Sequence, residues 1–342
     1  MSEDRKRCTR CIMSETFPRI DFDEQGVCSF CRDKMFFTIE DTAVAKARGE
    51  MEKISKDHRD SAGYHGIVCY SGGKDSTYTL MLAVKKYKLR VLAYTLDNSF
   101  ISPVTFDNMR RVLDNLGVDH MIARPAAPHF KAIARACALH DIYPPRTLAR
   151  ISSICNACIT MVNIGALRLA YEKRIPYIIS GFTLGQIPAN AIVFKSNYRF
   201  LHENRRESLK RLKTHAGDVV DTYYRVSDDL LDRADGFAPM NVNPLCLEEV
   251  TEEQIVSKIS ELGWVAPKDV DGCSSNCRLN TFNNYVHEIR LGYNPYELEL
   301  SHLIRKGLLT RKEALRKVHD RDEHQNRQIM QELGITEKDL VS

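Results

Sequence analysis

Short apolar segments alternate with amphipathic segments through the first half of the chain. Apolar runs rich in β-branched and aromatic residues predict strands at residues 65–70, 90–95, 120–123 and 175–180. Apolar residues that recur every three or four positions predict helices at residues 38–60, 77–87, 106–116 and 161–173. The alternation predicts an α/β fold with a doubly wound parallel sheet that helices cover on both faces.

The two ends of the chain have different patterns. Residues 1–35 are rich in turn-forming residues and predict a small module, appended to a sheet domain that we expect to span residues 36–250. From residue 251 to residue 342 the pattern is helical, most clearly at residues 252–263 and 311–318. A chain of 342 residues is long enough for one large or two medium domains with well-buried cores.

Composition narrows the class of protein. Hydrophobic residues make up 43% and charged residues 27% of the chain, without a long uncharged apolar run, which argues against disorder and against a membrane span. The charged N-terminus leads to Cys8 without the apolar stretch of a secretory signal, so we expect a cytoplasmic protein. Its eleven cysteines should then be reduced, and clustered ones should bind metals. A net charge of +4 is compatible with an RNA or nucleotide substrate but does not by itself indicate one.

A glycine-rich loop follows the first predicted strand and precedes a predicted helix. It consists of Ser71, Gly72, Gly73, Lys74, Asp75 and Ser76. Two glycines let the backbone approach an anion, the helix N-terminus offers free N–H groups, and Lys74 adds a charged donor. The spacing differs from that of a Walker loop and of a dinucleotide-binding loop. The sequence therefore predicts a phosphate site of another type.

The loop resembles the SGGxDS signature of the PP-loop ATP pyrophosphatases, a family that includes tRNA thiolases, GMP synthetases and argininosuccinate synthetases. The likeness extends over residues 65–246 and implies a HUP-like sheet. It implies that Mg²⁺-ATP is bound at the loop, that Lys74 assists the leaving pyrophosphate, and that the acceptor is adenylated at a carbonyl or amide oxygen. It also implies adenosine contacts near Thr95 and Asp97, within residues 95–99, and near Gly181, within residues 180–183.

Two C-x2-C pairs lie in the N-terminal module. Cys8, Cys11, Cys28 and Cys31 have the spacing of a four-thiolate zinc site of the zinc-ribbon type. Such a site has no open coordination position, so we expect the zinc to be structural or to support a recognition surface.

A second group of cysteines lies beyond the third predicted strand. Cys155 and Cys158 form a C-x2-C pair, and Cys246 stands alone in a Pro-Leu-Cys sequence. Three thiolates suit a [4Fe-4S] cluster with one open iron. This layout resembles the cluster-dependent PP-loop tRNA thiolases and implies that sulfur held there displaces AMP. A persulfide relay and a set of ordinary core cysteines are the alternatives. Cys273 and Cys277 lie one helical turn apart, without a complete site of their own.

The two ends of the chain carry a competing resemblance. Residues 8–28 and 303–314 are similar to the PP-loop N-acetyl sugar amidotransferases of surface-polysaccharide synthesis, which install nitrogen on a sugar. We favour sulfur transfer, because chemistry follows the site rather than the ends.

The acceptor and the partners stay open at this point. The acceptor is a tRNA base, a small metabolite or a nucleotide sugar. A further protein could supply the sulfur or the ammonia, and the chain could form a homodimer. A basic stretch either contacts RNA phosphates or is a solvated helix face. It comprises Arg205, Arg206, Lys210, Arg211 and Lys213. We assign no role to His287 or His302. A nucleotide-binding protein without turnover is a further alternative.

Overall fold

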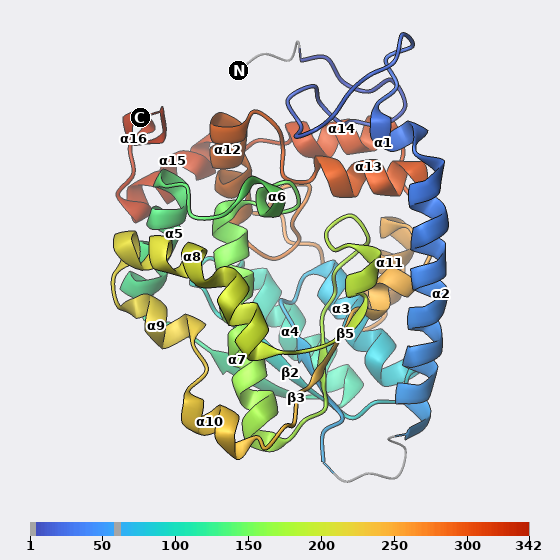
Figure 1. The fold of residues 1–342 in the computed structure, drawn as a ribbon, viewed down its shortest axis with the longest axis vertical. Helices are drawn as coiled ribbons and strands as arrows, with labels where there is room; N and C mark the ends of the chain where they lie inside the picture. Colours follow the sequence, from blue (N-terminus) through green and yellow to red (C-terminus); the bar gives the residue numbers. More distant parts are fainter. Residues whose placement is uncertain (1–4, 58–62, 342) are drawn as a thin grey trace.

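The computed structural model describes residues 5–57 and 63–341 (Figure 1). Its centre is a six-stranded sheet with the strand order β3-β2-β1-β4-β6-β5. The strands are β1 Gly66–Cys69, β2 Val91–Leu96, β3 Asp119–Ala123, β4 Tyr177–Ile179, β5 Val193–Lys195 and β6 Met240–Val242.

The sheet is mostly parallel, as the pattern predicts. β1 pairs in parallel with β2 and β4, β2 with β3, and β4 with β6. The short edge strand β5 runs antiparallel to β6 and departs from the expectation of an all-parallel sheet. The predicted strands at residues 65–70, 90–95, 120–123 and 175–180 correspond to β1 to β4. β5 and β6 have three residues each, too few for a readable alternation of apolar and polar positions.

Helices surround the sheet and form the C-terminal region. They are α1 Ser29–Arg32, α2 Lys34–Asp57, α3 Lys74–Met81, α4 Pro103–Leu116, α5 Ala127–Leu139, α6 Pro145–Leu148, α7 Ser153–Lys173, α8 Tyr198–Ala216, α9 Val219–Tyr224, α10 Asp228–Arg233, α11 Glu252–Ser260, α12 Leu279–Leu291, α13 Glu297–Arg305, α14 Arg311–His319, α15 Glu323–Leu333 and α16 Glu337–Val341. Short π and 3-10 segments are η1 Leu82–Lys86, η2 Ala189–Ala191 and η3 Pro244–Leu247.

Local signals explain several helix ends. Helix α4 begins with Pro103 in its first turn and ends at Gly117, whose φ of 63° is the left-handed conformation that favours glycine. Helices α11 and α14 each begin with a capping box, from Thr251 and Thr310. Within the predicted helix at 77–87, α3 gives way to the π segment η1. Positions 58–60 of the predicted helix at 38–60 lie outside the described residues.

The central helix α7 is long and apolar enough to cross a membrane by length and composition alone. Half of its most apolar window is buried, and it packs against β1, β2 and β4 (Figure 1). Packing against the sheet is therefore enough to explain why α7 is apolar.

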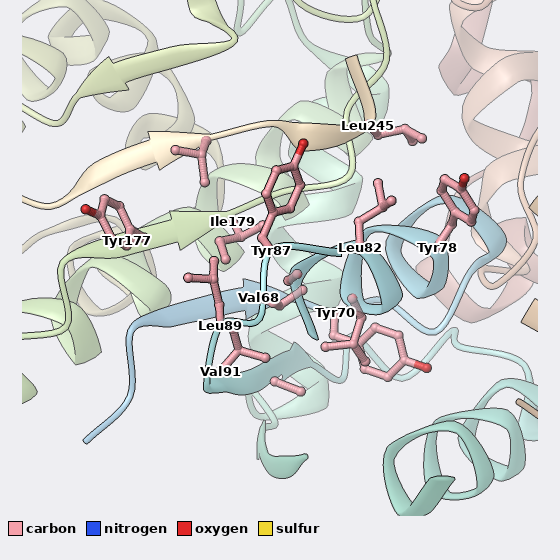
Figure 2. Packing of buried hydrophobic residues seen from close by; sticks show 14 of the residues in the cluster. Val68, Tyr70, Tyr78, Leu82, Tyr87, Leu89, Val91, Tyr177, Ile179 and Leu245 are labelled. Carbon is pink, nitrogen blue, oxygen red and sulfur yellow. The ribbon is translucent and has the colours of Figure 1, made fainter. Parts of the chain in front are cut away.

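The main apolar core lies between the sheet and the helices that follow the phosphate loop (Figure 2). Val68 of β1 and Ile179 of β4 are fully buried, and Leu82 and Tyr87 pack over them from η1 and its end. This packing fixes the end of β1 relative to α3, and with it the position of the loop between them.

The N-terminal module packs on the C-terminal helices (Figure 1). Arg7 forms an ion pair of 2.8 Å with the buried Glu297 of α13, and Ser14 N–H donates to the same carboxylate. Phe17 packs against Tyr293 with a ring-centroid distance of 5.0 Å. The N-terminal module therefore lies in contact with α13 and the segment before it.

Candidate functional site

A cavity of about 450 Å³ opens at the carboxyl ends of β1, β2 and β4. Its walls also include the first turns of α7, the segments 245–252 and 272–280, and part of α13. The carboxyl ends of parallel strands are where open α/β sheets bind ligands, and this volume suits a small molecule such as a nucleotide.

The glycine-rich loop forms one wall of the cavity. The hydroxyls of Ser71 and Ser76 lie 3.0 Å apart, and Ser76 Oγ also donates to Gly73 O. Gly72 has a φ of +73°, and a Cβ atom there would lie 2.5 Å from a methyl of Thr105. Only glycine fits this position, and the loop is held in one shape at the N-terminus of α3.

The C-terminal region covers the loop. The Trp264 indole donates to Gly72 O at 3.0 Å. Ser275 Oγ accepts a hydrogen bond of 2.8 Å from Lys74 N–H, in the first turn of α3. The region after residue 251 therefore completes the site.

Charged side chains gather beside the loop. Lys74 Nζ lies 2.9 Å from Asp75 Oδ2 and 3.6 Å from Glu252 Oε2. Burial alone would lower the pKa of Lys74, but the carboxylates of Asp75 and Glu252 outweigh it and raise this pKa. Lys74 is therefore a permanent cation at the cavity wall, suited to a phosphate.

Glu299 of α13 is a half-buried carboxyl on the cavity wall that no sequence motif marks. Its Oε1 accepts a hydrogen bond of 2.7 Å from Thr183 Oγ1, in the loop after β4. Burial raises the pKa of Glu299 to about 7. The cavity thus contains a group that can gain or lose a proton at neutral pH.

The three residues expected at the adenosine lie in different places. Gly181 lines the cavity, and a Cβ there would lie 3.1 Å from Asp75 O, so its loop passes close to α3. Thr95 is buried and bonds to Tyr70 O and His120, and Asp97 pairs with Arg124. Neither Thr95 nor Asp97 is among the residues lining the cavity.

Thiols form another part of the wall. Cys155 and Cys158 lie one turn apart at the start of α7, where Ser152 Oγ caps the helix by accepting from Cys155 N–H. Asn98 Nδ2 lies 3.6 Å from Cys158 Sγ and 3.7 Å from Cys277 Sγ. The structure thus places Cys277 beside the pair.

Asparagine amides face these thiols. Asn283 Nδ2 donates to Cys155 Sγ at 2.9 Å, in addition to the Asn98 contacts. Burial raises the pKa of all three thiols, that of Cys277 to about 12. Amide donors aimed at sulfur stabilise a thiolate once a metal replaces the proton.

Cys246, predicted as the third ligand, lies elsewhere on the wall. Its thiol donates to Phe182 O at 3.1 Å, and the residue lines the same cavity as the pair on α7. Cys246 comes from η3, beyond β6. The cavity wall therefore offers two candidates for a third thiol beside Cys155 and Cys158, namely Cys246 and Cys277, and Cys277 shares the Asn98 amide with Cys158.

The four N-terminal cysteines form a site that can hold a metal ion, since their sulfurs all lie within 4.8 Å of one another. Cys8 Sγ is 3.9 Å from Cys31 Sγ, and Cys11 Sγ is 3.7 Å from Cys28 Sγ. Sulfurs bound tetrahedrally at about 2.3 Å from a zinc ion lie about 3.8 Å apart. Hydrogen bonds from the Cys11 and Cys28 thiols lower the pKa of Cys31 below its ordinary value.

Two members of the basic stretch on α8 pair with nearby acids. Arg206 lies 3.1 Å from Glu203, Lys213 lies 3.0 Å from Asp218, and Arg211 donates to a backbone carbonyl. Such pairing is typical of a solvated helix face.

The two C-terminal histidines are buried. Burial lowers the pKa of His287 to about 3 and that of His302 to about 4, so both are neutral at pH 7. His302 lines the cavity and lies 3.5 Å from Glu40, whereas His287 packs against Tyr293.

No protein-family model matches the chain. The chain is similar to the uncharacterized protein MJ1599 of Methanocaldococcus jannaschii, with 22% identity over 311 residues. The similar region covers 90% of this chain and 91% of that protein. The likeness extends along most of both chains and assigns no activity.

Proposed function

We propose that this chain is a PP-loop type adenylating enzyme, which converts ATP to AMP and pyrophosphate and replaces an oxygen of its acceptor with sulfur. The observation that carries the proposal is that the glycine-rich loop lines one cavity together with several cysteines, among them Cys155, Cys158 and Cys277. The loop suits activation of an oxygen by ATP, and the thiols suit delivery of sulfur beside it.

The residues of the loop supply the activation step. The N–H groups of the first turn of α3 other than that of Lys74, together with the Lys74 ammonium, would bind the β- and γ-phosphates. Asp75 offers a carboxylate of the kind that Mg²⁺ binds. The acceptor oxygen forms a bond to the α-phosphorus, and the bond from that phosphorus to the pyrophosphate oxygen breaks. Lys74 stabilises the charge that grows on the leaving pyrophosphate. Glu299 can exchange a proton with the acceptor.

The three cavity thiols fit an iron–sulfur cluster. Among the described residues, only the N-terminal group has all its sulfurs within 4.8 Å of one another, so Cys155, Cys158 and Cys277 are spaced more widely than the ligands of one zinc ion. Wider spacing suits thiolates that bind different irons of a [4Fe-4S] cluster. Cys155, Cys158 and Cys277 would hold such a cluster, which would supply a site for the sulfide that takes the place of AMP on the adenylated acceptor.

The N-terminal site would hold a structural zinc. Its four thiols leave no coordination position for a substrate. The module packs against α13, and α13 supplies Glu299 to the cavity wall. By holding the module folded, the zinc would help to keep α13 in place.

An N-acetyl sugar amidotransferase is the second candidate. The observation in its favour is that the two segments with that resemblance pack together. Arg311 of α14 donates to Cys11 O and Cys8 O, and Ile12 is buried beside Leu300 and Ala314. In that reaction ammonia would take the place of sulfide, and the adenylation step would be unchanged.

The experiment that tests the proposal measures AMP and pyrophosphate from anaerobically purified protein. One set of reactions contains unmodified tRNA and sulfide, and a second contains N-acetylated nucleotide sugars and ammonium. AMP formation with a thiolated product supports sulfur transfer, and AMP formation with an aminated sugar supports the second candidate. Binding of an ATP analogue without AMP formation in either set would contradict both and favour a nucleotide-binding protein without turnover.

A further inference from the structure

One short loop, residues 271–277, touches both the phosphate loop and the thiols. Ser275 Oγ accepts from Lys74 N–H at 2.8 Å. Two residues later, Cys277 Sγ shares the Asn98 amide with Cys158. Only two positions in the sequence therefore separate the residue that contacts the phosphate loop, Ser275, from the residue that lies beside the thiols, Cys277.

The 271–277 loop is held at both ends. Asp271 Oδ1 accepts from the N–H groups of Cys273 and Ser274, each at 2.8 Å. At the other end, Ser102 N–H donates to Asn276 O at 2.9 Å, and Ile101 forms a β-bridge with Cys277. These contacts leave the middle of the loop, at Ser275, facing the phosphate loop.

Ser275 has a hydrogen-bonding capacity that its protein contacts do not use. Its oxygen accepts from Lys74 N–H, and within residues 63–341 no acceptor for its hydroxyl hydrogen is recorded. Ser275 lines the cavity, and its Oγ lies 3.1 Å from the position of a Cβ on Gly73. The hydroxyl hydrogen is thus available at the place where phosphate oxygens meet the first turn of α3.

We propose that Ser275 is a ligand of the nucleotide phosphates, and that metal binding at the thiols strengthens nucleotide binding through residues 275–277. The inference rests on the proposed function. A metal bound to Cys277 would add a constraint to the end that the Ile101 bridge and the Asn276 contact already hold, so less of the remaining freedom is lost when Ser275 engages a phosphate. Because such coupling is reciprocal, the nucleotide also strengthens metal binding.

The test is calorimetric titration of a non-hydrolysable ATP analogue into the full chain, with and without anaerobic reconstitution by iron and sulfide. Ser275→Ala should weaken analogue binding about tenfold, as expected for loss of a hydrogen bond to a charged group, and Ser275→Thr should restore it. Iron-loaded wild type should bind the analogue at least about fivefold more tightly than the iron-free protein. Cys137→Ser, a change in the buried core of α5, should leave both affinities unchanged.

Each contrary outcome has a distinct meaning. Equal affinity of wild type and Ser275→Ala for the analogue would overturn the role of Ser275. Equal affinity with and without iron, or no retention of iron by these thiols, would overturn the coupling. Failure of every variant to bind the analogue would overturn the proposed function together with this inference.

Discussion

Gly72 offers a sharp test of the phosphate-loop conformation. Its φ is +73°, and an added Cβ would lie 2.5 Å from Thr105 Cγ2 and 2.8 Å from Met109 Cε. Both neighbours are buried and cannot move into solvent. We expect Gly72→Ala to be destabilised by the left-handed backbone, at about 1–2 kcal/mol, and by overpacking, at about 1–3 kcal/mol.

Gly117 provides the matched control. Its φ is +63°, but no atom lies within 4 Å of an added Cβ, so Gly117→Ala carries the backbone cost alone. The difference in free energy of unfolding between the two variants should therefore be about 1–3 kcal/mol.

The assay is denaturant unfolding followed by tryptophan fluorescence. Trp264 is the sole tryptophan of the sequence, and its indole donates to Gly72 O, so its emission reports on the loop directly. Gly72→Ala should also lose affinity for an ATP analogue, whereas Gly117→Ala should retain it. Equal stability and equal analogue binding in the two variants would refute the described loop conformation.

Three further predictions concern charge and metal. Lys74→Met should lower the rate of pyrophosphate release at saturating ATP by about 10²–10³-fold, whereas the exposed Lys86→Met should not. Burial raises the pKa of Glu299 from 4.5 to about 7. The protonated carboxyl therefore contributes to the free energy of unfolding at low pH, and this contribution is lost as pH rises through 7. Glu299→Gln should therefore raise the free energy of unfolding at pH 8 by up to about 3 kcal/mol, with a smaller gain at pH 5, and an equal gain at both would be contrary. Cys28→Ser should lower the zinc content and the free energy of unfolding by several kcal/mol, and unchanged zinc would exclude this site.

The sequence contains most of the information for the centre of the fold. The strands β1 to β4 follow from short apolar runs, and the loop after β1 follows from Gly72 and Gly73. The four N-terminal thiols follow from spacing alone, because both pairs are local.

The remaining features depend on contacts between distant segments. Cys277 reaches Cys158 because Ile101 bridges the chain at Cys277, and no local pattern encodes that pairing. Side chains alternate along a strand, so Tyr94 and Leu96 of β2 line the cavity while Thr95 turns to His120. Glu299 belongs to an amphipathic helix. In the sequence, a carboxyl that lines the cavity cannot be distinguished from the other polar positions of that helix.

The most direct test of the central claim is the iron and labile-sulfide content of the anaerobically reconstituted chain and two variants. If the phosphate loop shares its cavity with a cluster on Cys155, Cys158 and Cys277, wild type should hold about four irons and four sulfides. Cys277→Ser should lose them, and Cys246→Ser should keep them. A wild-type chain without iron, or a loss in Cys246→Ser with retention in Cys277→Ser, would contradict the account.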